Sequence, residues 1–230
     1  MTKPQTIQCP VCQTETSFEW HPFIDGSQQK DSKAQVMNGD LFAFECDHCG
    51  AKRRLTLPLT YQDSQDHLLY FLIPKDQIND TGHQEMIQSY FFSLADQIDH
   101  YQIRLLTDSR QLIEKLTIAE AGYQDTEIEL VKLLTDGLFQ NQFIDLAFSD
   151  CYFYIHQGKE KFLYLTDQGP QLVDFHQELL SLVRQKYKKR LNQPYHGQLR
   201  TIDQAWATQV LQHKETGQDS EQASDPNHPN

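Results

Sequence analysis

Alternating apolar and polar positions characterise the first third of the chain. Residues 16–20 place Phe18 and Trp20 on one face, which predicts one strand of a hairpin. Further strands are expected at 41–45, 52–57 and 67–73. Residues 25–40 contain hardly an apolar side chain, so they predict a mobile loop, and residues 1–6 predict a loose end.

Helical spacing replaces this alternation in the middle of the chain. Apolar residues recur every fourth position over residues 81–98 and predict a helix with one buried face. Asp108 with Gln111 three positions later has the spacing of a capping box, which predicts the start of a second helix. Thr126 with Glu129 predicts a third in the same way, and the second and third helices are expected to pack as a pair.

The last third of the chain combines aromatic strands with helices. Strands are expected at 143–149, 151–156 and 161–166, the last two joined by a turn at 157–160. Pro170 suits the first position of a helix, so a long helix is expected from there into the basic residues of 184–190. Thr201 is expected to cap a short helix, and from about residue 215 the sequence is too polar to order itself.

Two Cys-x-x-Cys pairs are the strongest chemical signal in the chain. They are Cys9 with Cys12 and Cys46 with Cys49. Zinc is held by four thiolates at the corners of a tetrahedron, and each pair supplies two that converge on one point. The separation between the pairs exceeds the ~15–20 residues of the usual pattern, but the longer loop closes at little entropic cost. We therefore expect one structural zinc ion per chain, with iron as the alternative metal for a tetrahedral sulfur site.

Together these elements predict an α+β protein. A four-cysteine zinc ribbon is expected to attach to antiparallel sheets packed with four or five helices. We divide the chain into a domain at 7–137, made of the ribbon at 7–57 and an α/β part at 58–137, and a C-terminal hairpin with helices at 138–214. A disordered tail is expected at 215–230.

Composition and charge restrict the partners. The chain of 230 residues has 20 basic and 32 acidic residues, a net charge of -12, which repels nucleic-acid phosphates and anionic lipid heads. No apolar run could span a bilayer, and the N-terminus does not have the apolar core of a signal peptide. Five cysteines in such a chain favour metal ligation in a reducing compartment, so we expect a cytoplasmic protein without membrane contact.

The cysteine pattern also resembles a known family. Cys9-Pro10-Val11-Cys12, followed by Cys46-x-x-Cys49-Gly50 and alternating strands, is similar to the CpXC-domain family of bacterial and archaeal proteins. The stretch from Leu106 to Lys132 resembles the second half of that family, so the similarity covers about residues 7–137. Asp47 stands where the motif of the second pair would have proline. The family is named for its cysteines, and the resemblance brings no catalytic residue.

The remaining motifs favour a binding role over catalysis. The chain contains no glycine-rich phosphate loop, serine elbow or carboxylate pair with a histidine, so we expect no enzyme. The leading hypothesis is a non-catalytic zinc-binding protein that interacts with a protein partner. A nucleic-acid-binding zinc ribbon, using the basic residues of 184–190, is the alternative.

A thiol redox enzyme or a metal-dependent enzyme is a third hypothesis. A redox pair at Cys9 and Cys12 would need to open a helix, whereas its flanks predict strands. His48 could replace Cys49 as a ligand, but it is expected to face solvent. Cys151 lies in an aromatic strand and is expected to pack as a small apolar residue.

Overall fold

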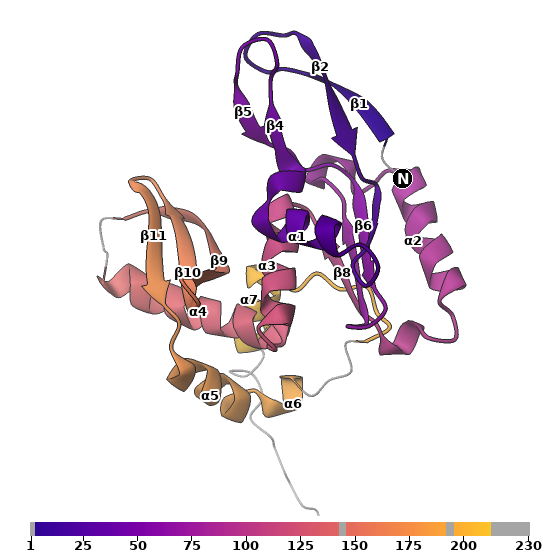
Figure 1. The fold of residues 1–230 in the computed structure, drawn as a ribbon. Helices are drawn as coiled ribbons and strands as arrows, with labels where there is room; N and C mark the ends of the chain where they lie inside the picture. Colours follow the sequence, from indigo (N-terminus) through magenta and orange to yellow (C-terminus); the bar gives the residue numbers. More distant parts are fainter. Residues whose placement is uncertain (1–2, 143–145, 192–195, 213–230) are drawn as a thin grey trace, which may run out of the picture.

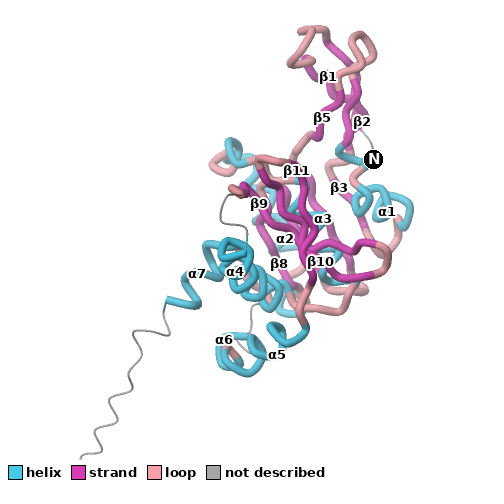
Figure 2. The backbone as a smooth tube through the Cα atoms, turned by 90° about the vertical axis from the view of Figure 1, so that its left-hand side faces the viewer, coloured by secondary structure: helices cyan, strands magenta, loops and turns pink. Residues whose placement is uncertain are grey.

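The computed structural model describes residues 3–142, 146–191 and 196–212, and three parts of the chain are distinct in it (Figure 1). A ribbon of two hairpins projects from a body built on a four-stranded sheet, and a second body contains a three-stranded sheet with helices against it. The view in Figure 2, turned by 90°, shows the same projecting ribbon. The expected α+β class is confirmed, and helices α1 and α6 add to the five that the sequence predicted.

The ribbon consists of two antiparallel hairpins that lie far apart in the sequence. Its strands are β1 (Lys3–Gln8) with β2 (Glu15–Trp20), and β4 (Ala43–Glu45) with β5 (Lys52–Arg54). The expected loose end at residues 1–6 is wrong from Lys3 onward, because β1 pairs with β2 along its whole length. One Cys-x-x-Cys pair occupies the turn of each hairpin.

The first body is a mixed sheet with a helix layer on each face. Its strand order is β3 (Phe23–Asp25), β6 (Leu59–Asp63), β7 (Leu68–Leu72) and β8 (Gln102–Leu106). The inner pair is antiparallel and both outer pairs are parallel. All five residues of β7 are buried because both faces of the sheet are covered, which explains its uninterrupted apolar sequence.

Helices on opposite faces give the first body two apolar cores. The helices are α1 (Lys30–Asn38), α2 (Thr81–Ser93) and α3 (Ser109–Glu120). Val36 of α1 and Leu112 of α3 pack with Tyr70 on one face, whereas Met86 and Tyr90 of α2 pack on the other face. The short turns η1 (Asp40–Phe42), η2 (Lys75–Gln77) and η3 (Ile98–His100) join these elements.

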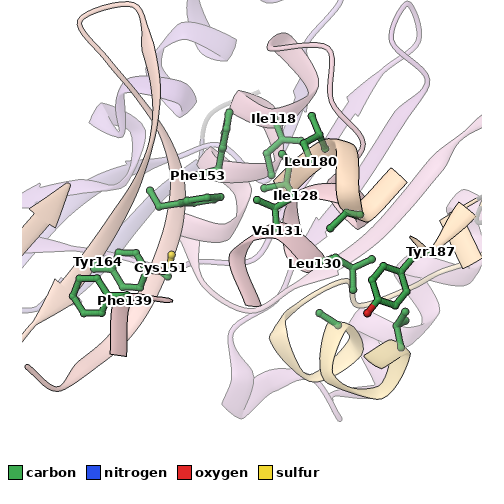
Figure 3. Packing of buried hydrophobic residues seen from close by; sticks show 14 residues of the cluster. Ile118, Ile128, Leu130, Val131, Phe139, Cys151, Phe153, Tyr164, Leu180 and Tyr187 are labelled. Atoms are coloured by element: carbon green, nitrogen blue, oxygen red, sulfur yellow. The ribbon is translucent and has the colours of Figure 1, made fainter. Parts of the chain in front are cut away.

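The second body combines an antiparallel sheet with four helices. Its elements are β9 (Phe148–His156), β10 (Lys159–Thr166), β11 (Gly169–Asp174), α4 (Asp125–Gln142), α5 (Gln177–Lys186), α6 (Lys188–Leu191) and α7 (Gln204–Gln212). Figure 3 shows its core, in which the rings of Phe139 and Tyr164 stack with centroids 4.2 Å apart. Phe153 and Phe162 are cross-strand partners and are both buried. The aromatic strands therefore form a core, as their alternation predicts.

The expected loop at residues 25–40 is wrong. Residues Lys30–Asn38 form helix α1, and Gly39 ends it with a φ of 84°. Two neighbouring apolar residues hold the helix, since Val36 is fully buried against the first sheet and Met37 is partly buried in the same core. Ile24 and Phe42, on either side of α1, lie in the same core. The segment between the two hairpins thus packs into the first body, and the domain boundary at residue 57 stays a prediction.

The expected helix from Pro170 is also wrong over its first part. Residues Gly169–Asp174 form β11, which pairs with β10, and α5 begins only at Gln177. Pro170 is tolerated because β11 is an edge strand whose outer side has no partner in the sheet. Of the strand expected at 143–149, residues 143–145 lie outside the described residues, and Phe148 begins the single strand β9. The tail expected at 215–230 also lies outside them.

Helix α4 begins at Asp125, two residues before the start that a cap at Thr126 implies, and uses a different cap. The carboxylate of Glu127 accepts a hydrogen bond from the Gln124 backbone N–H at 3.4 Å. Thr126 and Glu129 therefore lie within the helix and do not cap it. The capping box of α3 is confirmed. The Asp108 side chain accepts a hydrogen bond from the backbone N–H of Gln111, and the Gln111 side chain accepts one from the backbone N–H of Asp108.

Candidate metal centre

The two cysteine turns have the same backbone structure. Gln13 N–H donates to the carbonyl of Cys9 at 2.9 Å, and Gly50 N–H donates to the carbonyl of Cys46 at 2.8 Å. In each turn the residue after the second cysteine has positive φ, 62° at Gln13 and 68° at Gly50. Such turns direct both cysteine side chains of a pair to one side, which is the local geometry that a metal knuckle needs.

The four cysteines that the sequence singled out lie together. The Sγ atoms of Cys9, Cys12, Cys46 and Cys49 are all within 4.8 Å of one another. Cys9 Sγ is 3.7 Å from Cys49 Sγ, and Cys12 Sγ is 3.6 Å from Cys46 Sγ. Four sulfurs about 2.3 Å from a central zinc ion would be about 3.8 Å apart, so the sulfur positions fit a tetrahedral metal. No pair is joined as a disulfide.

A small apolar core supports the site on one side. Cys9 and Cys46 are buried, and Phe44 packs against them, whereas Cys49 is exposed. Phe18 contacts both this core and the core of the first body. The candidate site is therefore anchored to the body on its buried side and faces solvent on the other.

Hydrogen bonds within the turns shift the acidity of the thiols. The Thr14 hydroxyl and backbone N–H lower the pKa of the Cys12 thiol to about 5, and the Cys49 backbone N–H lowers the pKa of Cys46. The Ala51 backbone N–H also lowers the pKa of Cys49, but burial and the three neighbouring thiols outweigh it and raise this pKa to about 12. A metal ion binds cysteine as the thiolate, so metal binding at this site would release protons from the thiols.

Sequence reasoning found the ligand candidates but missed part of their support. Thr16 Oγ1 lies 3.6 Å from Cys46 Sγ, and Thr14 acts on Cys12 as described above. The second residue after each Cys-x-x-Cys pair directs its backbone N–H to the sulfur of the second cysteine of that pair. Its position could therefore have been recognised from the spacing. His48 is exposed and lies outside the group of four sulfurs.

Within residues 3–142, 146–191 and 196–212, the four cysteines are the only group of three or more side chains placed to hold a metal ion. In the same ranges, no helix has both the length and the apolar character needed to cross a membrane.

The fold and the site define a protein in which a four-cysteine ribbon is attached to an α+β body. A family model described as CpXC protein matches residues 7–132, which is more than half of the 230 residues. The protein belongs to this family, and the resemblance seen in the sequence is confirmed, with a C-terminal limit of 132 in place of about 137. No curated protein and no solved structure matches the chain.

Proposed function

We propose that the protein is a non-catalytic zinc-binding protein, in which one zinc ion per chain holds the two hairpins of the ribbon together. The observation that carries the proposal is the position of four cysteine sulfurs within 4.8 Å of one another. Four protein thiolates fill a tetrahedral coordination sphere, so no position is left for a water molecule to be activated. Thiolates favour zinc over magnesium and calcium, and iron is the other metal that such a site accepts.

The small size of the ribbon core supports a structural role for the metal. Cys9, Phe44 and Cys46 are its only buried apolar residues in the part of the chain that the structure describes. Short hairpins with so little apolar area are not stable alone in water. The metal would therefore supply the contact between β1–β2 and β4–β5 that side-chain packing does not.

The proposed role of the stabilised ribbon is to contact a protein partner. The ribbon projects from the bodies, and Val11, in the turn between Cys9 and Cys12, is 59% exposed (Figure 1). Binding to nucleic acid is disfavoured by the net charge of -12. In addition, the Arg184 guanidinium, one of the basic residues considered for phosphate binding, donates to both Glu127 carboxylate oxygens at 2.8 and 2.9 Å.

Native mass spectrometry with elemental analysis tests the metal. We expect one zinc per chain in the wild-type protein and none in Cys46→Ser. Cys151→Ala is the matched control, because this cysteine is buried in the core of the second body and should leave the metal content unchanged. Less than roughly a tenth of an equivalent of metal in wild-type protein purified without chelator would contradict the four-thiolate site.

The protein partner needs a separate test. Val11→Asp keeps all four sulfurs and should keep the zinc, while it places a charge at the exposed tip. We expect proteins that are captured from a cell extract by the immobilised wild-type chain to be lost from this variant. Equal capture by both chains, or no specific capture by the wild type, would contradict a partner at the tip.

A further inference from the structure

A cavity of about 450 Å³ lies between the two bodies, away from the cysteine site. It is lined by α3, α4, β9, the end of β8 and the segment that enters α7. Its volume is in the range of small-molecule binding sites, about 300–1,000 Å³. None of its lining residues belongs to the ribbon, so the cavity is independent of the proposed zinc site.

Buried charged side chains form the floor of this cavity. Lys132 Nζ lies 2.9 Å from Glu114 Oε1, and Lys115 Nζ lies 2.9 Å from Glu129 Oε1. All four residues are buried between α3 and α4. Desolvation of four charged groups is expensive, and residues needed only for packing would be apolar. A polar floor beneath a cavity of this size is the arrangement of a ligand site.

One floor residue has an unsatisfied oxygen. Among the described residues, Glu129 Oε2 is the one buried side-chain oxygen or nitrogen without a hydrogen-bond partner. The Lys132 ammonium is 3.2 Å away, but it donates to Glu114 Oε1 at 2.9 Å and to Glu129 Oε1 at 3.3 Å. Leaving a buried carboxylate oxygen without a donor costs free energy, which an N–H group of a ligand would recover.

A further carboxylate lies on the same face of α4. Asp136 follows Glu129 by two helical turns and also lines the cavity. It accepts hydrogen bonds from the Tyr164 hydroxyl at 2.8 Å and from Gln204 Nε2 at 3.0 Å, and both donors are neutral. Burial raises the pKa of Asp136 above its ordinary value, so the carboxylate lacks full compensation from the groups around it.

The buried charges of the cavity therefore favour a cation. Three buried carboxylates line it, against two buried ammonium groups. The carboxylates are Glu114, Glu129 and Asp136, and the ammonium groups are those of Lys115 and Lys132. These oxygens do not form a metal-binding group in the described residues, which argues against an inorganic ion. The rest of the lining is mixed: Leu105, Phe148 and Ile202 are apolar, and the polar residues include Lys75, whose side chain is exposed.

We propose that this cavity binds a small organic cation. Its ammonium or amidinium group pairs with Asp136, a further N–H group of the ligand donates to Glu129 Oε2, and its apolar part lies against Phe148 and Ile202. Helices α3 and α4 up to Lys132 lie within the family match at 7–132, whereas β9 and the entry to α7 lie beyond it. The C-terminal segment of this chain thus closes a site whose charged floor is built by the CpXC part.

Three probes with the same aromatic body and different charges test the proposal. These are 2-phenylethylamine, 2-phenylethanol and 3-phenylpropionate, each titrated into the full-length, metal-loaded protein and followed by calorimetry and by amide chemical shifts. We expect the amine to bind at least about tenfold more tightly than the alcohol or the acid. The shifted amides should cluster at residues 129–136 and 201–205. Equal affinities, tighter binding of the acid, shifts outside these segments or no binding of the amine at 10 mM would each overturn the proposal.

Two carboxylate variants distinguish the effect of one carboxylate on amine binding from the effect of the overall negative charge of the protein. Asp136→Asn keeps the shape of the side chain and should weaken amine binding by about tenfold, with little change for the alcohol. Asp150→Asn, at the exposed edge of the same cavity, should change amine affinity by less than about twofold, because solvent screens that charge. Unchanged amine affinity in a folded Asp136→Asn variant, or an equal loss in both variants, would also overturn the proposal.

Discussion

At the scale of single residues, the chemistry of the cysteine site was readable from the sequence, and its support was not. The spacing of the two Cys-x-x-Cys pairs, which begin at Cys9 and Cys46, was enough to predict a candidate metal site. The equivalence of Gln13 and Gly50 could not be read in the same way. Glycine signals positive φ, whereas glutamine at such a position gives no signal and is held there by its surroundings.

Substitutions at these two positions should change metal retention in opposite directions. Gly50→Ala should weaken metal retention against a chelator by about 0.5–1 kcal/mol, because an L-residue resists left-handed φ and only part of that cost is offset by the lower entropy of the unfolded chain. A Cβ at Gly50 would meet no atom within 4 Å, so the cost is one of backbone conformation and not of packing.

Gln13→Gly is the complementary variant and should strengthen retention by a similar amount, about 0.5–1 kcal/mol. Gln13 is exposed, so little packing is lost with its side chain. Competition with a zinc-binding dye measures both variants on the same scale. A change in the same direction for the two variants would show that backbone strain does not govern these turns.

At the scale of elements, segments with a strong sequence pattern were predicted correctly, whereas segments with isolated apolar residues were not. The capping box at Asp108 located α3, because both partners of the motif were present in the sequence. Helix α1 was missed because its apolar contacts come from the adjacent residues Val36 and Met37, and two adjacent residues create no helical period. The strand β11 was missed because Pro170 fits both a helix start and an edge strand, and only the pairing with β10 decides between them.

A buried ion pair between elements also cannot be predicted from apolar periodicity. Asp125, at the start of α4, accepts hydrogen bonds from Arg104 of β8 at 2.7 and 2.9 Å and lies 3.4 Å from the Lys115 ammonium of α3. These contacts join β8 and α3 of the first body to α4 of the second. Such pairs contribute stability only while both signs of charge are present, since either one alone would be buried without compensation.

We therefore expect Asp125→Asn to lower the free energy of unfolding by about 3–5 kcal/mol, because Arg104 and Lys115 remain charged and buried. Asp174→Asn is the matched control, since this aspartate also pairs with a lysine, Lys161, but is exposed. The control should unfold almost as the wild type does. Urea titration monitored by circular dichroism measures both variants. Comparable losses would show that burial of the pair is unimportant.

The same aspartate predicts a dependence of stability on pH. Burial opposes its charge, but Lys115 and Arg104 outweigh burial and hold the pKa of Asp125 at about 2, below its ordinary value of about 3.9 when unfolded. A lowered folded pKa gives stability that is fully present above the unfolded value and is lost as pH falls through the folded one. Wild-type protein should therefore lose more stability than Asp125→Asn between about pH 4 and pH 2. Parallel curves for the two proteins would contradict this.

At the scale of the whole molecule, the fold class followed from the sequence, whereas the boundary between cooperative units expected at residue 57 stays a prediction. The sequence suggested that all of residues 7–57 form the ribbon, but Ile24 and Phe42 are buried in the core of the first body. Long-range packing of this kind depends on which surfaces meet, and no local pattern reports it. Phe18, which contacts both cores, makes the ribbon and the first body continuous.

Metal removal tests this arrangement over the whole chain. With a strong chelator, we expect amide hydrogen exchange to increase in the hairpins at residues 7–17 and 43–54, whose core depends on the four cysteines. Residues 24–42 should keep their protection despite lying between the hairpins, because Val36 and Phe42 stay packed against the first sheet. Helices α3 and α4 should be unaffected, since none of their residues belongs to the cysteine core.

The pattern of exchange then distinguishes three arrangements. Loss confined to the hairpins supports a ribbon that folds with its metal on an independent body. Loss that extends through residues 24–42 would make the inserted segment part of the metal-dependent unit, as the boundary at residue 57 implies. Loss that reaches α3 and α4 would mean that the contact of Phe18 with both cores couples the ribbon to the body in a single cooperative unit, so that the metal stabilises the entire fold.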